Sequence, residues 1–262
     1  MKKHFRLICF IYLLSFILLC SSALSAPINE VPYASLTGTQ LITFDDVSGG
    51  FPGTNYDNIF ESGNTAFGEH FLGQTVSDSS GFDVISGLPS GGGLTLVAGA
   101  TNQNLYVVDS SFGSGPPGSN AMAGLGPLGY PNDDAAGEGA FSLLFDYDQS
   151  QFGIQVLGGF DGNAYIDFFA RDGSLIDGIT LIDIFDDGEV YYGFERDVGI
   201  MDIAGITLWN DDPLGLGFDN ILFDVAGVPG DPNAVVPEPS TFVLLGGGLA
   251  GLALFARRRK KE

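Results

Sequence analysis

The sequence contains little cysteine, with only Cys9 and Cys20 among its 262 residues. Both lie in the first 26 residues, where basic residues precede an apolar run and small residues follow it, which is the layout of a secretory signal peptide. A lipoprotein signal ending at Cys20 is an alternative, although Leu19 occupies a position at which such signals carry a small residue. Once residues 1–26 are removed, the mature chain offers no disulfide, no thiol nucleophile and no cysteine metal ligand.

Basic residues are scarce between Pro27 and Val236, where only Arg171 and Arg196 occur. The same region holds 30 acidic residues, so its formal charge is 2 − 30 = −28. Such a charge repels nucleic acid and anionic lipid, because phosphate binding requires clustered Lys and Arg. Nucleic acid is therefore excluded as a partner, whereas divalent cations and neutral or cationic partners remain compatible with this composition.

Motifs for catalysis are also missing. His70 is the only histidine left after residues 1–26, and the sequence has no Gly-x-Ser-x-Gly elbow, no phosphate-binding glycine loop and no His-x-x-x-His pair. Two carboxylates can serve a glycoside hydrolase, but with 30 acidic residues some pair always falls at a suitable distance. We therefore expect a protein without enzymatic activity and keep a secreted hydrolase as the third alternative.

Long helical periodicity appears only near the two ends of the chain, and the region between them is typical of β-structure. Glycine and aspartate interrupt apolar segments about every 8 to 12 residues, the spacing of short antiparallel strands. Alternating apolar residues predict buried faces at Ile42 and Phe44, at Phe141, Leu143 and Phe145, and at Ile221, Phe223 and Val225. We predict an all-β fold, a single antiparallel β-sandwich of jelly-roll type over residues 27–226.

Two further patterns predict how the strands are connected. The pairs Asp161-Gly162, Asp172-Gly173 and Asp187-Gly188 favour tight hairpin turns, which predicts a meander from about Phe152 to Phe194. The stretch from Ser110 to Gly139 is crowded with glycine and proline and predicts a long surface loop. Residues 227–235 form a linker that Pro229 and Pro232 stiffen.

The C-terminal residues 236–262 combine three features in a fixed order. The segment Val236, Pro237, Glu238, Pro239 and Ser240 comes first, an apolar run of about 16 residues follows from Thr241 to Ala256, and Arg257, Arg258, Arg259, Lys260 and Lys261 come last. The prolines keep the first segment extended, because they fix φ and remove amide donors. The apolar run is near the lower length limit of a transmembrane helix, and the basic residues favour a cytoplasmic end.

These residues closely resemble the C-terminal sorting signal of PEP-CTERM proteins, which are exported by Gram-negative bacteria. The resemblance covers Val236 to Lys261, whereas an ordinary membrane anchor, the alternative, requires no Pro-Glu-Pro. It implies that exosortase, a membrane cysteine transpeptidase, is a partner, and that the protein is held in the inner membrane before processing. It also implies a later place at the cell surface or in the extracellular matrix, with a structural or adhesive role linked to exopolysaccharide.

Two short segments resemble the opening and closing strands of PEP-CTERM ectodomains, namely Leu41 to Asp46 and Gly217 to Ile221. Those ectodomains are similar to jelly-roll carbohydrate-binding modules, in which the first and last strands lie side by side and a structural calcium often sits where they meet. The resemblance makes Asp45, Asp46 and Asp219 candidate calcium ligands, since calcium prefers oxygen ligands. Turn capping is the alternative role for these carboxylates. The denser acidic group Asp183, Asp186, Asp187 and Glu189 predicts an acidic hairpin tip, with a cation site as its alternative.

Aromatic side chains can stack on sugar rings, which makes Tyr56, Tyr130, Tyr191, Tyr192 and Trp209 nominal glycan-binding candidates. Trp209 is the best of them, because it ends a predicted strand and is followed by Asn210, Asp211 and Asp212. Packing within the fold is the alternative for each. A calcium-dependent carbohydrate-binding module is accordingly the second function that the sequence predicts.

Overall fold

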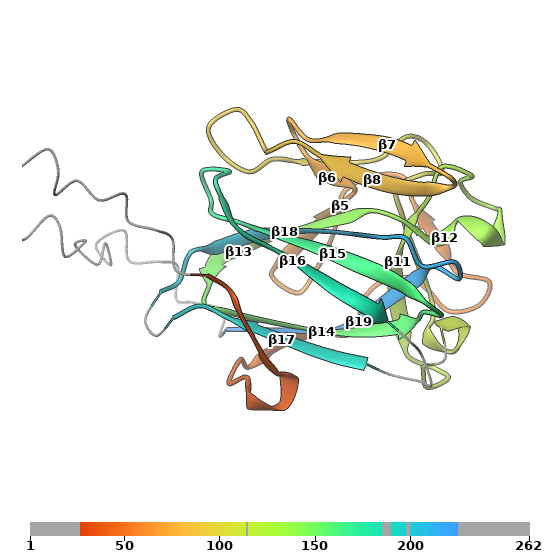
Figure 1. Cartoon of the computed structure of the whole chain (residues 1–262). Helices are drawn as coiled ribbons and strands as arrows, with labels where there is room; N and C mark the ends of the chain where they lie inside the picture. Colours follow the sequence, from red (N-terminus) through yellow and green to blue (C-terminus); the bar gives the residue numbers. More distant parts are fainter. Residues whose placement is uncertain (1–26, 114, 185–189, 198–199, 225–262) are drawn as a thin grey trace, which may run out of the picture. The chain divides into compact units, whose positions relative to one another are not determined.

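The computed structural model describes residues 27–113, 115–184, 190–197 and 200–224 (Figure 1). These residues form 19 strands and three short 3-10 turns, and they contain no α-helix. All pairs of named strands are antiparallel, which confirms the predicted all-β class. In this part of the chain no helix is long and apolar enough to cross a membrane, and the two predicted terminal helices lie outside it.

The strands form two large sheets and two small ones. The nine-stranded sheet has the order β1 (Asn29–Pro32), β17 (Val190–Glu195), β14 (Gln151–Gly158), β19 (Leu216–Phe223), β11 (Asn120–Leu125), β10 (Leu105–Asp109) and β3 (Thr54–Tyr56), with β12 (Ala136–Gly139) on β11 and β2 (Gln40–Ile42) on β19. The six-stranded sheet has the order β16 (Leu175–Ile184), β15 (Gly162–Phe169), β18 (Ile203–Asn210), β13 (Phe141–Gln149), β5 (Thr65–Gly68) and β4 (Phe60–Ser62). The small sheets pair β6 (His70–Phe71) with β9 (Leu96–Val97) and β7 (Thr75–Ser79) with β8 (Phe82–Ser86).

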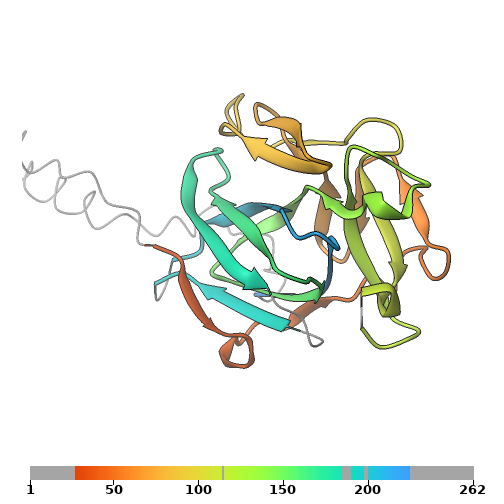
Figure 2. The same cartoon turned by 45° about the vertical axis from the view of Figure 1, so that its right-hand side comes forward.

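The two large sheets face each other across one apolar core (Figures 1 and 2). Phe152 of β14 meets Phe168 of β15 with ring centroids 6.1 Å apart, and Phe145 of β13 meets Phe223 of β19 at 5.0 Å. Both contacts join one large sheet to the other. Burial of these rings removes large apolar areas from water, which is the main favourable term in folding.

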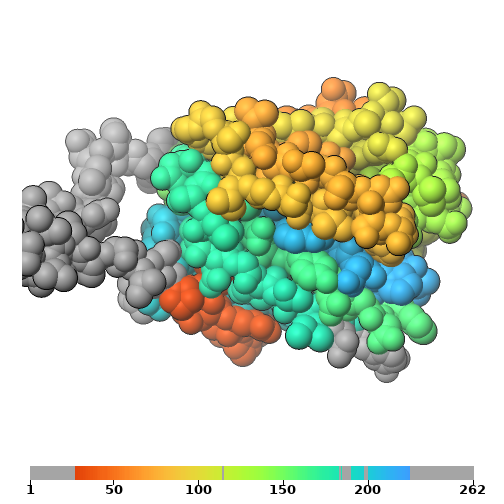
Figure 3. All heavy atoms as spheres, turned by 45° about the horizontal axis from the view of Figure 1, so that its top comes forward, coloured from red at the N-terminus to blue at the C-terminus, as the bar shows by residue number. Residues whose placement is uncertain are grey.

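A third layer covers part of the outer face of the six-stranded sheet. It consists of the two small sheets and their loops, which lie over β5, β13 and β18 (Figures 1 and 3). Phe71 and Leu96 of this layer pack with Phe169 of β15 in a separate apolar cluster. The outward residues of β16 are not covered, since Gly178, Thr180 and Ile182 are exposed.

The predicted meander is wrong, because the chain changes sheets. β14 and β17 pair in the nine-stranded sheet, whereas β15 and β16 pair with each other in the six-stranded one. Asp172-Gly173 does lie in the β15–β16 turn, and Gly173 has a φ of +87°. Asp161-Gly162 instead lies where the chain crosses from β14 to β15, and Asp187-Gly188 lies outside the described residues.

The predicted surface loop from Ser110 to Gly139 is also wrong. β11 is a strand of the nine-stranded sheet, between β10 and β19, and its Met122 is fully buried. Its glycine permits a close approach of two chains, because a Cβ on Gly124 would lie 2.2 Å from the carbonyl oxygen of Gly139. Gly124, which in the sequence favours a loop, is therefore required for the close pairing of β11 with β12.

The predicted side-by-side placement of opening and closing strands is confirmed by the pairing of β2 with β19. Ile42 is opposite Ile221 and Leu41 is opposite Leu222. An earlier strand, β1, was not predicted, and it pairs with β17 at the edge of the nine-stranded sheet. The described strands therefore do not begin with the predicted opening segment.

Candidate functional site

The predicted sorting residues lie outside the part of the chain that the structure describes. They are Val236, Pro237, Glu238, Pro239 and Ser240 of the motif and Arg257, Arg258, Arg259, Lys260 and Lys261 of the basic end. The contacts described below therefore belong to the β domain.

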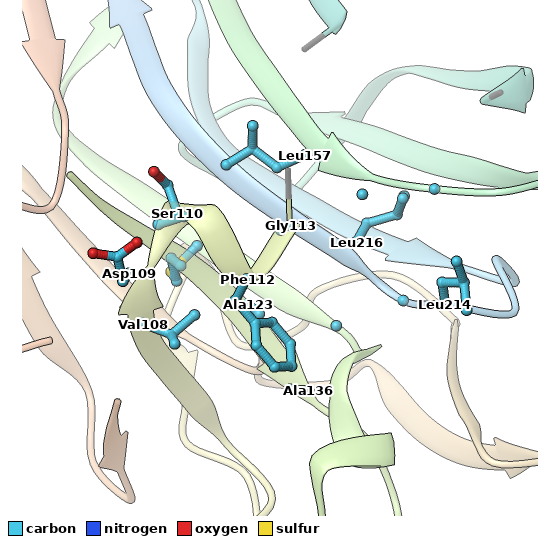
Figure 4. Close-up of a pocket in the computed structure, with 17 residues that line it drawn as sticks. Val108, Asp109, Ser110, Phe112, Gly113, Ala123, Ala136, Leu157, Leu214 and Leu216 are labelled. Atoms are coloured by element: carbon cyan, nitrogen blue, oxygen red, sulfur yellow. The ribbon is translucent and has the colours of Figure 1, made fainter. Parts of the chain in front are cut away.

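A pocket of about 130 Å³ lies on the outer face of the nine-stranded sheet (Figure 4). Its floor comes from small residues of β11 and β19, among them Ala121, Ala123 and Gly217. The side chains of Leu157, Phe112 and Leu214 lie around it (Figure 4). The last two are exposed, at 52% and 68%, so the pocket opens to solvent between apolar groups.

The structure requires glycine at some positions of this pocket and not at others. Gly137 and Gly215 have positive φ, and a Cβ on either would lie 2.6 to 2.7 Å from backbone atoms. Gly217 has neither constraint, because the nearest atom to its Cβ would be 3.6 Å away. A side chain at this position would project over the floor, so a glycine here keeps the pocket open.

The pocket can hold an apolar group, but it offers little chemistry. A cavity of similar size that is lined by apolar side chains binds benzene in another protein. The one carboxylate at the rim belongs to Asp109, which accepts hydrogen bonds from the Ser111 hydroxyl and from the backbone N–H of Ser111 and Gly118. These bonds, that of the Ser111 hydroxyl first, lower the pKa of Asp109 and keep it ionised.

The three candidate calcium ligands bind different partners. Asp45 accepts a hydrogen bond from the backbone N–H of Asn120 at 2.9 Å, whereas Asp46 accepts one from the Ser62 hydroxyl at 2.6 Å. Asp219 is buried and accepts one from the backbone N–H of Asn220 at 2.6 Å. Among the described residues, no group of three or more His, Cys, Asp or Glu side chains is arranged to hold a metal ion. The calcium site stays a prediction.

Trp209 stacks on Tyr165, a residue that the sequence did not single out. The two are opposite each other in the β15–β18 pair, with ring centroids 5.4 Å apart and planes at 16°. The Tyr165 hydroxyl donates to Asp211 at 2.9 Å, and the backbone N–H of Asn163 donates to the same carboxylate at 2.6 Å. Alternation places both aromatic rings on the outer face of the six-stranded sheet, because Ile166 and Leu208 beside them point into the core.

The other aromatic candidates pack within the fold. Tyr56 lies on Phe60 at 4.5 Å, Tyr130 beside Tyr106 at 5.9 Å, and Tyr191 against Tyr33 at 5.1 Å. Tyr192 packs against the main core. In the acidic group, Asp186, Asp187 and Glu189 lie outside the described residues.

A buried polar cluster under the third layer also escaped sequence reasoning. Nδ1 of His70 is 2.8 Å from the carboxylate of Glu69, and the buried Asp83 accepts a hydrogen bond from the backbone N–H of Ala140 at 3.2 Å. Burial raises the pKa of Asp83 to about 7. The nearby Ser142 hydroxyl is fully buried against Thr207 at 2.8 Å, so solvent does not reach it.

Comparison with known proteins gives a structural likeness and a sorting motif. No curated protein sequence matches the chain. The enzymatically active domain of tailspike protein 4 from bacteriophage CBA120 is similar at 12% identity and a TM-score of 0.31, a likeness that covers 62% of this chain and 19% of that one. At this score no shared fold is established.

The family model of the PEP-CTERM protein-sorting motif matches residues 235–260. This stretch includes the Pro-Glu-Pro segment, the apolar run and most of the basic cluster. The match confirms the resemblance seen in the sequence. The chain carries a PEP-CTERM protein-sorting motif, the signal of an exported protein that is anchored in the membrane before exosortase processes it.

Proposed function

We propose that the β domain of residues 27–226 is the exported part of a cell-envelope or extracellular-matrix protein that exosortase delivers. Its role is structural or adhesive, is linked to exopolysaccharide, and involves no catalysis. The observation that carries the proposal is the match of the sorting motif to residues 235–260. A jelly-roll type of β-sandwich suits this role, and the two facing sheets with their shared aromatic core support it.

Charge and composition also support a role outside the cytoplasmic membrane. With a formal charge of −28 over residues 27–235, the domain repels anionic lipid, so the C-terminal signal rather than the domain surface provides membrane contact. The domain has no cysteine after residue 26, so no disulfide adds to the stability that the apolar core provides. A domain of this length buries enough surface for that.

Substitutions in the motif test the sorting. Replacing Pro237, Glu238 and Pro239 together by alanine leaves the apolar run and the basic end in place, so the intact protein should stay in the inner membrane. Membrane fractionation and intact mass in the native host measure this. Replacing Pro229 and Pro232 in the linker is the matched control, since it also removes prolines and should leave processing normal. Normal processing of the motif variant would contradict the proposal.

Substitutions in the basic end should disturb sorting in a different way from substitutions in the motif. Replacing Arg257 through Lys261 by neutral residues removes the cytoplasmic retention signal but keeps the motif. We expect loss of a fixed orientation, so that part of the protein passes through the membrane with its tail unprocessed. Fractionation separates this outcome from an intact protein stranded in the membrane.

A carbohydrate-binding module is the second candidate function, and the stacked pair Tyr165 and Trp209 favours it.

Calcium dependence would belong to this function through Asp45, Asp46 and Asp219. A cation that binds only the folded state raises Tm by mass action, and magnesium should do less because it loses water reluctantly. Equal Tm in calcium and in chelator at matched ionic strength would return the three residues to turn capping. Matching is necessary, because any salt relieves self-repulsion at this net charge.

A further inference from the structure

The uncovered part of the six-stranded sheet carries a row of side chains across three strands. Thr180 of β16, Tyr165 of β15 and Trp209 of β18 are opposite one another in the two strand pairs. The third layer does not cover this row completely, since Thr180 is exposed and both aromatic residues are partly exposed. The row is therefore an open surface on regular strands, whose positions the sheet fixes.

The aromatic pair is held in one orientation. The ring planes differ by 16°, and the Tyr165 hydroxyl donates to Asp211, which also accepts from the backbone of Asn163. Partial burial acts to raise the pKa of Asp211, but the hydrogen bonds from Asn163 and Tyr165 together outweigh it, so the pKa lies below its usual value and the carboxylate remains ionised. Because the hydrogen bond to Asp211 fixes the hydroxyl at the end of the Tyr165 side chain, the aromatic pair offers a preorganised apolar surface.

A carboxylate without a bound donor lies on the same face. Asp167 is two residues after Tyr165, so the two side chains project from the same face about 7 Å apart along the strand. No donor among the described residues hydrogen-bonds to its carboxylate, and the only cause that raises its pKa, to about 6, is burial. Such a partly desolvated acceptor gains from a donor that a ligand brings.

Gly178 is the reason that this carboxylate has room. It is opposite Asp167 in the β15–β16 pair, it is exposed, and a Cβ on it would lie 2.7 Å from Oδ1 of Asp167. Its φ is not positive and no backbone atom is close, so the conformation does not require glycine. The missing side chain allows the carboxylate to lean across the strand pair beside the aromatic rings.

We propose that Tyr165, Trp209 and Asp167 form a binding site for a neutral carbohydrate. The apolar face of a sugar ring packs against the exposed edges of the stacked aromatic pair, and a sugar hydroxyl donates to the Asp167 carboxylate. The charge of −28 over residues 27–235 opposes anionic polysaccharides, which selects neutral ones. This proposal rests on the second candidate function and gives it a site that needs no calcium.

The test uses the mature protein purified from its native host and the fluorescence of Trp209, the only tryptophan in the chain. Titration with soluble β-glucan, mannan and galactan should change this fluorescence for at least one of them, whereas an anionic polyuronate should change it far less at equal ionic strength. Binding measured by calorimetry should weaken about tenfold or more in Asp167→Asn and in Trp209→Ala. Calorimetry is needed for the second variant because it has no tryptophan.

Two further variants separate a site from a general effect. Gly178→Ala keeps every proposed contact residue but displaces the Asp167 carboxylate, so it should weaken binding as Asp167→Asn does. Tyr191→Ala removes an exposed tyrosine from the other sheet and should leave binding unchanged. Circular dichroism checks that each variant folds.

Several results would overturn the proposal. They are the absence of binding to every neutral polysaccharide in the panel, equal binding of the anionic one, or unchanged affinity in Trp209→Ala and Asp167→Asn. None of these results would affect the sorting function, because membrane fractionation of the motif variants tests that independently.

Discussion

Asp212 and Gly162 are in contact where the chain crosses from one large sheet to the other. Oδ2 of Asp212 accepts a hydrogen bond from the backbone N–H of Gly162 at 3.0 Å, and a Cβ on Gly162 would lie 2.2 Å from Cα of Asp212. The same oxygen accepts from Phe160 at 2.7 Å, and Oδ1 accepts from Leu214 at 3.0 Å. One buried carboxylate thus satisfies the backbone donors of two loops.

The first prediction is that Asp212→Ala destabilises the domain by about 3 kcal/mol, because it leaves the buried N–H of Gly162 and the partly buried N–H groups of Phe160 and Leu214 without an acceptor. Asp161→Ala is the matched control on the same loop. Its side chain is exposed, so we expect a change within about 0.5 kcal/mol. Denaturant unfolding of both variants measures the difference, and equal stabilities would contradict the role given to Asp212.

The second prediction concerns the pH dependence that Asp83 gives to stability. Burial first, and then repulsion from Glu69 and Asp78, raises the pKa of Asp83 to about 7, although the N–H of Ala140 and the nearby His70 oppose the rise. Since the unfolded pKa is about 3.9, the folded state binds the proton more tightly. This stabilisation is fully present below about pH 4 and is lost as the pH rises to about 7.

Comparison with Asp83→Asn isolates this group, because acidification also relieves the self-repulsion of the whole domain. The Tm of the unsubstituted protein minus that of the variant should fall between about pH 4 and pH 7 and stay constant above it. A difference that does not change with pH would show that Asp83 titrates normally.

The third prediction compares the two arginines of the domain. Arg196 is buried and binds Asp202 through Nε at 2.7 Å and Nη2 at 2.8 Å, whereas Arg171 is about half exposed and binds Asp148 at 2.7 Å. Removal of Arg196 loses its buried packing and both hydrogen bonds to Asp202, whose side chain is 37% exposed, and should cost about 2 kcal/mol. Removal of Arg171 should cost about 1 kcal/mol or less.

Arg196→Lys tests whether charge alone accounts for the greater loss of stability expected on removal of Arg196. A lysine keeps the charge but cannot bind both carboxylate oxygens in the same plane, so it should recover only part of the lost stability. Full recovery in thermal unfolding would mean that the paired hydrogen bonds contribute nothing.

The fourth prediction separates two glycines in adjacent strands. Gly124→Ala should destabilise the domain by about 2 kcal/mol, because its Cβ would meet the backbone of Gly139. Gly217→Ala should be neutral or should stabilise the domain by about 0.5 kcal/mol, since its Cβ has room and alanine reduces the freedom of the unfolded chain. Loss of stability in Gly217→Ala would show that the pocket floor is strained rather than open.

The strand class and the buried faces could be predicted, because alternation is a local property of the sequence. Phe141, Leu143 and Phe145 are all buried as predicted. The sheet to which a strand belongs is not local. Asp172-Gly173 closes a hairpin, whereas Gly162 of Asp161-Gly162 binds Asp212, about 50 residues away in the sequence.

The candidate site was predicted only in part for the same reason. Trp209 could be selected from the polar residues after it, but Tyr165 becomes its partner through strand register. Similarly, the sequence around Gly124 predicts a loop, and only its pairing with Gly139 explains why this strand position is a glycine. The sorting motif needed no such information, since its three features are contiguous and match residues 235–260.

The intact mass of the mature protein from its native host, with exosortase present, tests the central claim most directly. Processing at the sorting motif predicts a mature chain that lacks residues Thr241 to Glu262, with a mass lower by that segment. A mature protein that still contains Thr241 to Glu262 would show that these residues act only as a membrane anchor, which would contradict the account.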